Sequence, residues 1–180
     1  MDKIRKKVHR LWGPLGDGEK LHSTPDFATE MAELCKGPLE IRSKRVSKWG
    51  FGEQVEHMYL VAHWVLDRMN EAMAVTDSPE RTTALCHGML IGHWIPRGLY
   101  PTLPELEAQG GTMEEIQPLK DRLEERLAKL DWTWPQVSTH TGRSYHPWMK
   151  MLLMPHWFFF LTVHHLHHLA ILRDIRKKAD

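Results

Sequence analysis

The sequence predicts an all-α protein, a four-helix bundle with one or two extra short helices. Apolar residues recur at helical spacing in several segments, and no segment shows a convincing strand alternation. Residues that favour helix starts and ends bound these segments. The chain has 180 residues, of which 42% are apolar, enough for one domain with a real core. We therefore expect a single domain over residues 1–180, with residues 1–23 as an N-terminal extension.

In the N-terminal half, the spacing of apolar residues predicts a short helix over residues 1–11 and two longer helices after it. Thr24 suits the N-cap and Pro25 the first helical position of a helix that Gly37-Pro38 ends. After a turn at residues 49–52, a longer pattern runs from about Glu53 to Ala74. Its apolar stripe consists of Val55, Met58, Val61, Ala62, Val65, Leu66 and Met69, and His57 stands at the edge of this stripe.

The C-terminal half predicts three further helices. Ser78-Pro79 begins one that reaches about Trp94, and a proline-rich loop follows. Either the capping box Thr112-x-x-Glu115 or Pro118 begins a leucine-striped helix. Residues 131–148 are expected to be irregular, and Pro155 begins the last helix, which ends near Lys178.

Thirteen histidines are many for this length, and four of them fall within five positions at 164, 165, 167 and 168. Residues four apart share one face of a helix, so His164 and His168 can both face one point. Two imidazoles on one helical face are half of a metal site, and we expect His57 to supply the third ligand. Three neutral imidazoles bind Zn²⁺ or Ni²⁺ and leave a coordination position open for water or a substrate thiol.

Other side chains near these three have several interpretations. His167 could replace His168 as a ligand or lie behind the ligands, and His165 is expected to pack or face solvent. Glu56 is not assigned to the site, because adjacent helix positions diverge. The remaining histidines considered are expected to be structural, although His63 or His146 could transfer protons near the metal; they are His63, His87, His93, His146 and His156.

Composition excludes several classes of function. A net charge of +1 without a basic stripe gives no indication of nucleic-acid binding. The most apolar window, residues 148–172, is interrupted by Lys150, Pro155 and the histidines, so we expect no membrane span. Cys35 and Cys86 form no disulfide framework, and the N-terminus has no secretory signal, which favours the cytoplasm.

Two di-iron classes also fit poorly. His164-x-x-His167-His168 matches one histidine box of the membrane desaturases, but those enzymes need several boxes and spanning helices. A ferritin-like site needs Glu-x-x-His on two helices, and Gln54 stands three residues before His57.

Two motifs resemble the DinB/YfiT-like superfamily. Residues 49–57, WGFGEQVEH, resemble the W-S-x-x-E-x-x-x-H opening of its second helix, and residues 163–170, VHHLHHLA, are similar to its last-helix motif H-x-x-H-H. The dipeptides His146-Pro147 and His156-Trp157 before the final histidines resemble an uncharacterised branch of it. The resemblance covers roughly residues 25–175.

The resemblance implies a four-helix bundle of DinB/YfiT type with a divalent metal held by three histidines, matched here by His57, His164 and His168. Members of the superfamily act in low-molecular-weight thiol chemistry, as thiol S-transferases and a thiol-dependent isomerase. The glutamine that often follows the last histidine is replaced here by Ala170 or Ile171, which would remove a hydrogen bond behind the ligands.

We therefore expect a metal-dependent enzyme, a thiol S-transferase or a hydrolase, acting on a small-molecule substrate such as a low-molecular-weight thiol. The alternative is a non-catalytic, metal-stabilised bundle that serves as a binding or stress-response module. A bundle with an apolar face also predicts a homodimer.

Overall fold

The computed structural model describes residues 25–75, 88, 95–98 and 100–179. The helices are α2 (Pro25–Cys35), α3 (Phe51–Ala74), the short 3₁₀ helix η2 (Pro104–Leu106), α5 (Met113–Ala128), α6 (Trp134–Thr139) and α7 (Met154–Lys177). The prediction of a mainly helical chain is confirmed for these residues. The helices predicted over residues 1–11 and 78–94 lie outside the described residues, apart from the helical Gly88.

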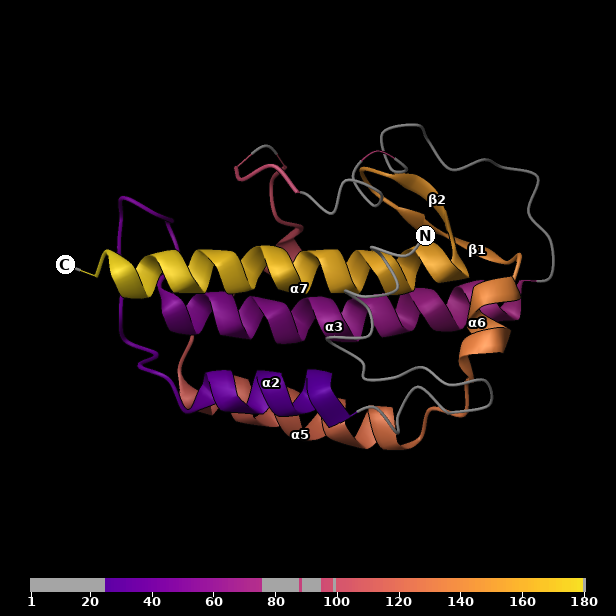
Figure 1. Cartoon of the computed structure of the whole chain (residues 1–180), viewed down its shortest axis with the longest axis horizontal. Helices are drawn as coiled ribbons and strands as arrows, with labels where there is room; N and C mark the ends of the chain where they lie inside the picture. Colours follow the sequence, from indigo (N-terminus) through magenta and orange to yellow (C-terminus); the bar gives the residue numbers. More distant parts are fainter. Residues whose placement is uncertain (1–24, 76–87, 89–94, 99, 180) are drawn as a thin grey trace.

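The two longest helices, α3 and α7, lie side by side and run in opposite directions (Figure 1). Helices α2 and α5 lie against each other and pack on α3. The core between these helices contains large buried side chains from all four, including Met31, Tyr59, Ile116, Trp157 and Phe158. Because the directions are opposite, the first turns of α3 lie beside the last third of α7, and the N-terminal half of α7 faces the end of α3.

Helix α3 occupies the centre of the fold. Gly50 is its N-cap, and the Glu53 carboxylate accepts the Gly50 N–H at 2.6 Å. The predicted apolar stripe is buried, together with four polar residues: Gln54, Glu56, His57 and His63. Buried polar groups in proteins are nearly always hydrogen-bonded, and the partners of these four define how the site is built.

Of the two predicted starts of the leucine-striped helix, the capping box is the one observed. Helix α5 begins at Met113, and the backbone N–H of Thr112 donates to the Glu115 carboxylate at 3.0 Å. Pro118 lies inside this helix rather than at its start.

The all-α prediction is wrong for residues 143–153, which form an antiparallel hairpin of β1 (Arg143–His146) and β2 (Lys150–Leu153). The irregular segment predicted over residues 131–148 likewise contains α6 and β1. The inward-facing residues of β1 are Ser144 and His146, so burial alternates but hydrophobicity does not. The Ser144 hydroxyl donates to the Arg68 carbonyl at 2.7 Å and so attaches the hairpin to α3.

None of the described helices combines the length and the apolar character that crossing a bilayer requires.

Candidate metal centre

Three imidazole rings from α3 and α7 meet in the interior. The Nε2 atom of His164 lies 3.2 Å from Nε2 of His57 and 3.1 Å from Nε2 of His168. Two nitrogens bound tetrahedrally to one Zn²⁺ at about 2.0–2.1 Å would lie about 3.3–3.4 Å apart. All three predicted residues are therefore brought together, with spacings that suit a single ion, and one nitrogen from each lies within 4.8 Å of the others.

The other ring nitrogens of His57 and His168 face oxygen atoms. Nδ1 of His57 lies 2.7 Å from the carbonyl oxygen of Leu106, which can only accept a hydrogen bond. Nδ1 of His168 lies 2.5 Å from Oε1 of Gln54, whose amide NH₂ group donates to Ser47 at 2.9 Å. Both Nδ1 atoms must therefore carry the proton, which leaves a lone pair on each Nε2.

The two lone pairs both face Nε2 of His164. A neutral His164 carries at most one proton on that atom and can satisfy only one of its two neighbours. The cluster is thus short of donors at its centre, where a divalent cation would accept all three lone pairs. The residues fit a metal ion on this ground, and their Nδ1 hydrogen bonds match the pattern found behind metal-bound histidines.

The electrostatics keep these rings neutral. Burial lowers the pKa of His57 to about 4, against the smaller upward effect of the Leu106 carbonyl. Burial also lowers the pKa values of His164 and His168 well below the usual value, and the neighbouring histidines lower them further. Neutral imidazole is the form that binds a metal, so no proton has to be displaced at neutral pH.

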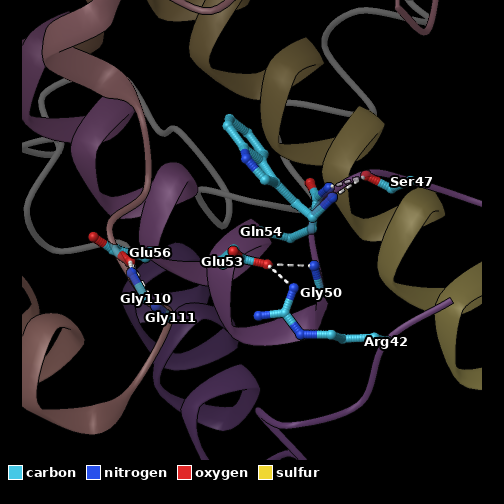
Figure 2. Close-up of polar contacts among 9 residues, drawn as sticks. Arg42, Ser47, Gly50, Glu53, Gln54, Glu56, Gly110 and Gly111 are labelled. Atoms are coloured by element: carbon cyan, nitrogen blue, oxygen red, sulfur yellow. Dashed lines mark hydrogen bonds and ion pairs between the residues drawn. The ribbon is translucent and has the colours of Figure 1, made fainter. Parts of the chain in front are cut away.

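Gln54 supplies the hydrogen-bond acceptor for the His168 ring. It stands three residues before His57 on α3 and reaches across to the His168 ring on α7. Ser47 holds its amide group and also accepts the Trp49 backbone N–H at 3.1 Å (Figure 2). The acceptor behind this candidate ligand on α7 is therefore supplied by α3.

Glu56 fixes residues 109–111, which follow Leu106 in the chain. Its carboxylate accepts the backbone N–H groups of Gln109, Gly110 and Gly111 at 2.9, 3.2 and 2.8 Å. Figure 2 shows the contacts with Gly110 and Gly111. The segment approaches α3 so closely that a Cβ on Gly52 would lie 2.0 Å from the Gly111 carbonyl oxygen. Gly111 itself has φ +70°, which favours glycine.

A cavity of about 510 Å³ adjoins the three imidazoles. Its walls are largely apolar and include Trp49, Trp64 and Phe160, and the Trp49 ring lies 4.8 Å from that of His57. Lys48 and Arg97 also line it. Among the described residues, no cysteine or carboxylate lines this cavity, and no fourth histidine, cysteine or carboxylate joins the cluster of His57, His164 and His168.

Three other histidines, His63, His165 and His167, lie outside the cluster of three nitrogens. His167 lines the cavity with its ring 5.0 Å from that of His168, and it bonds the backbone of Ile95 instead of joining the three nitrogens. His165 packs rather than faces solvent, 3.3 Å from a carboxylate oxygen of Glu30 on α2. His63 lies 2.9 Å from the Leu119 carbonyl on α5, a structural position.

The remaining histidines and the cysteines lie in several places. His146 is buried and lines the cavity. His156 lies on α7, where a structural role stays a prediction. Cys35 contacts the Tyr59 hydroxyl at 3.5 Å, while His87, His93 and Cys86 lie outside the described residues.

Sequence reasoning missed three contributors, Gln54, Glu56 and the Leu106 carbonyl. Gln54 and Glu56 carry only a weak signal of a buried polar role. Both are polar residues beside Val55 in the apolar stripe of a predicted helix. A backbone carbonyl has no sequence signal at all.

No protein-family model, curated protein or solved structure matches the chain. The metal centre is therefore inferred from the side-chain geometry.

Proposed function

We propose that this chain binds one divalent metal ion through His57, His164 and His168 and acts on a small molecule in the adjoining cavity. Zn²⁺ and Ni²⁺ are the ions that best suit three imidazole ligands. A DinB-like thiol S-transferase or hydrolase is the reaction type that we propose, on the resemblance of the two histidine motifs. A homodimer in the cytoplasm stays a prediction.

The observation that carries the proposal is the convergence of three Nε2 atoms, two of which carry unshared lone pairs. A purely structural packing of three histidines would gain from a donor at each contact, and this cluster lacks one. When bound, the ion supplies a Lewis acid with an open position.

The chain's own residues have separate tasks in this proposal. The Leu106 carbonyl and Gln54 hold two rings in the tautomer that binds metal. The aromatic walls, including Trp64 and Phe160, receive the apolar part of the substrate, and Lys48 and Arg97 favour a substrate with negative charge.

The cavity supports an enzyme over the non-catalytic alternative. A metal that only stabilised the bundle would need no space of about 510 Å³ beside its ligands. A substrate screen of the metal-loaded protein with thiol acceptors and hydrolysable esters distinguishes the two.

The test compares His57→Ala with His63→Ala. Both side chains are on α3, and each has a ring nitrogen close to a backbone carbonyl oxygen of another element. We expect the wild type and His63→Ala to bind one equivalent of Zn²⁺ or Ni²⁺, measured by elemental analysis after dialysis, and to gain thermal stability from it. His57→Ala should retain less than one equivalent. A wild type that retains neither metal contradicts the proposal.

A further inference from the structure

The imidazole of His146 belongs to the cavity but not to the cluster of three nitrogens. It is the last residue of β1, and the turn at residues 147–149 carries the chain into β2. His146 and the turn residues Trp148 and Met149 line the cavity with the three candidate ligands. The hairpin tip thus forms one wall of the space that adjoins the metal centre.

The turn determines which ring nitrogen of His146 carries the proton. Its Nδ1 atom lies 3.1 Å from the backbone nitrogen of Trp148 and 3.2 Å from that of Met149, and both N–H groups donate to it. An imidazole nitrogen that accepts hydrogen bonds has no proton, so the single proton of the neutral ring is on Nε2. His146 is therefore held as an N–H donor.

The Nε2–H group is left for a ligand. Among the described residues, Nε2 of His146 has no hydrogen-bond partner. This atom is also not fully enclosed by the protein. Because the ring is otherwise packed against Trp64, Trp157 and Phe160, the cavity is the accessible space beside it.

His146 lies near the metal centre. The Phe160 ring is 5.0 Å from that of His146 and 5.7 Å from that of His164, so one phenyl ring contacts both imidazoles. The two imidazoles are also close enough that a proton on His146 would lower the pKa of His164.

We propose that His146 is a fixed hydrogen-bond donor that selects ligands bearing an acceptor oxygen, a carboxylate or a carbonyl, for the cavity beside the three histidines. The proposal rests on the proposed metal site and adds the chemical class of its ligand. It differs from proton transfer, which would require the ring to gain and lose a proton. Burial lowers the pKa of His146 to about 4, so the ring stays neutral at pH 7 and keeps its N–H.

Two substitutions test the roles of the two nitrogens of the His146 ring one at a time. In His146→Asn, the amide oxygen can take the place of Nδ1 and accept the turn N–H groups, but the donor toward the cavity is lost. In His146→Gln, the longer amide can bring an N–H to the place of Nε2, while the acceptor for the turn is lost.

The probes are benzoate and benzenethiol, which share a ring but differ in the presence of acceptor oxygens. Each protein is loaded with Co²⁺, uptake is measured first, and each probe is then titrated anaerobically while the visible Co²⁺ spectrum is followed. We expect His146→Asn to bind benzoate about tenfold or more weakly than the wild type and benzenethiol with unchanged affinity. His146→Gln should keep most of the benzoate affinity but melt at a lower temperature.

The outcomes that overturn the proposal are distinct from those that overturn the metal site. Wild-type protein that takes up no Co²⁺ rejects the metal site. If Co²⁺ binds but His146→Asn binds benzoate as tightly as the wild type, only the role of His146 is rejected. If both variants bind benzoate and benzenethiol more weakly, and the loss of affinity follows the fall in melting temperature, His146 is structural and the proposal is again rejected.

Discussion

Gln54 connects the two helices that supply the candidate ligands. Its amide oxygen is 2.5 Å from Nδ1 of His168, and its NH₂ group is held by Ser47. An amide can donate from one end and accept at the other, so the Ser47 contact decides that the acceptor faces the histidine. The tautomer of His168 thus depends on a serine before α3 begins.

Gln54→Leu should lower Zn²⁺ affinity by about 10–100-fold, because the His168 ring loses the acceptor that keeps its proton on Nδ1. The measurement is competition with a chromophoric chelator. Gln54→Glu is the matched control, since it keeps an acceptor oxygen at the same position, and it should lose less. Equal, wild-type affinity in both variants would show that this contact does not tune the site.

At the scale of the element, the first two turns of α3 carry two carboxylates that accept backbone N–H groups. Glu53 accepts from Gly50 and so caps its own helix, and Arg42 pairs with it at 2.8 Å. Glu56 accepts from three residues of the segment after η2. That segment follows Leu106, the last residue of η2, whose carbonyl contacts His57. The second carboxylate therefore supports the candidate metal centre, whereas the first holds Gly50 and Arg42.

Glu56→Gln should reduce the free energy of unfolding by about 1–3 kcal/mol, because a buried charged acceptor is replaced by a neutral amide whose NH₂ group faces other donors. It should also weaken Zn²⁺ binding, through the looser Leu106 carbonyl. Urea unfolding and chelator competition measure the two effects.

Glu53→Gln serves as the control for that change. It should cost about 1 kcal/mol as a weakened helix cap and leave Zn²⁺ affinity unchanged. The assignment of Glu56 fails if the two variants change Zn²⁺ affinity equally.

At the scale of the whole molecule, the described residues include seven histidines whose pKa values are lowered, mainly by burial. They are His57, His63, His146, His164, His165, His167 and His168. In the unfolded chain a histidine has a pKa of about 6.5. Unfolding therefore takes up protons at pH values between the lowered pKa of the folded form and about 6.5.

The metal-free protein should lose stability as the pH falls from about 6.5 toward 4. A histidine with a lowered folded pKa contributes its full stabilisation above the unfolded value, and this is lost on acidification until the folded form also takes up the proton. Urea unfolding at pH 7.5, 6 and 5 in the presence of a chelator measures the loss. His146→Asn should show a smaller dependence on pH, because its residue no longer titrates. A wild-type stability that is flat over this range contradicts the prediction.

The hairpin illustrates a part of the fold that sequence reasoning could not predict. Strands are recognised by alternating hydrophobic residues, but the buried positions of β1 are Ser144 and His146. Ser144 is buried because it bonds a carbonyl of α3, and His146 because it binds its own turn and the aromatic rings around it. The Arg68 carbonyl and the aromatic rings belong to other elements, which the local sequence does not specify.

Glu56 and His57 show what helical periodicity can predict about side chains and what it cannot. Adjacent helix positions do diverge, and the two side chains serve different segments, the 109–111 backbone and the histidine cluster. Periodicity predicted the divergence, but not that a loop would place three N–H groups beside Glu56.

The sequence by itself determined the helices α2, α3, α5 and α7 and the pairing of His164 with His168, because both follow from the local repeat of the α-helix. It also indicated His57 as the third ring, although His57 and His164 are 107 positions apart. Only the tertiary structure decided the tautomers, the cavity and the donor on His146. These depend on backbone groups such as the Leu106 carbonyl and the Trp148 N–H, which every residue type carries and which only the folded chain brings to a particular ring.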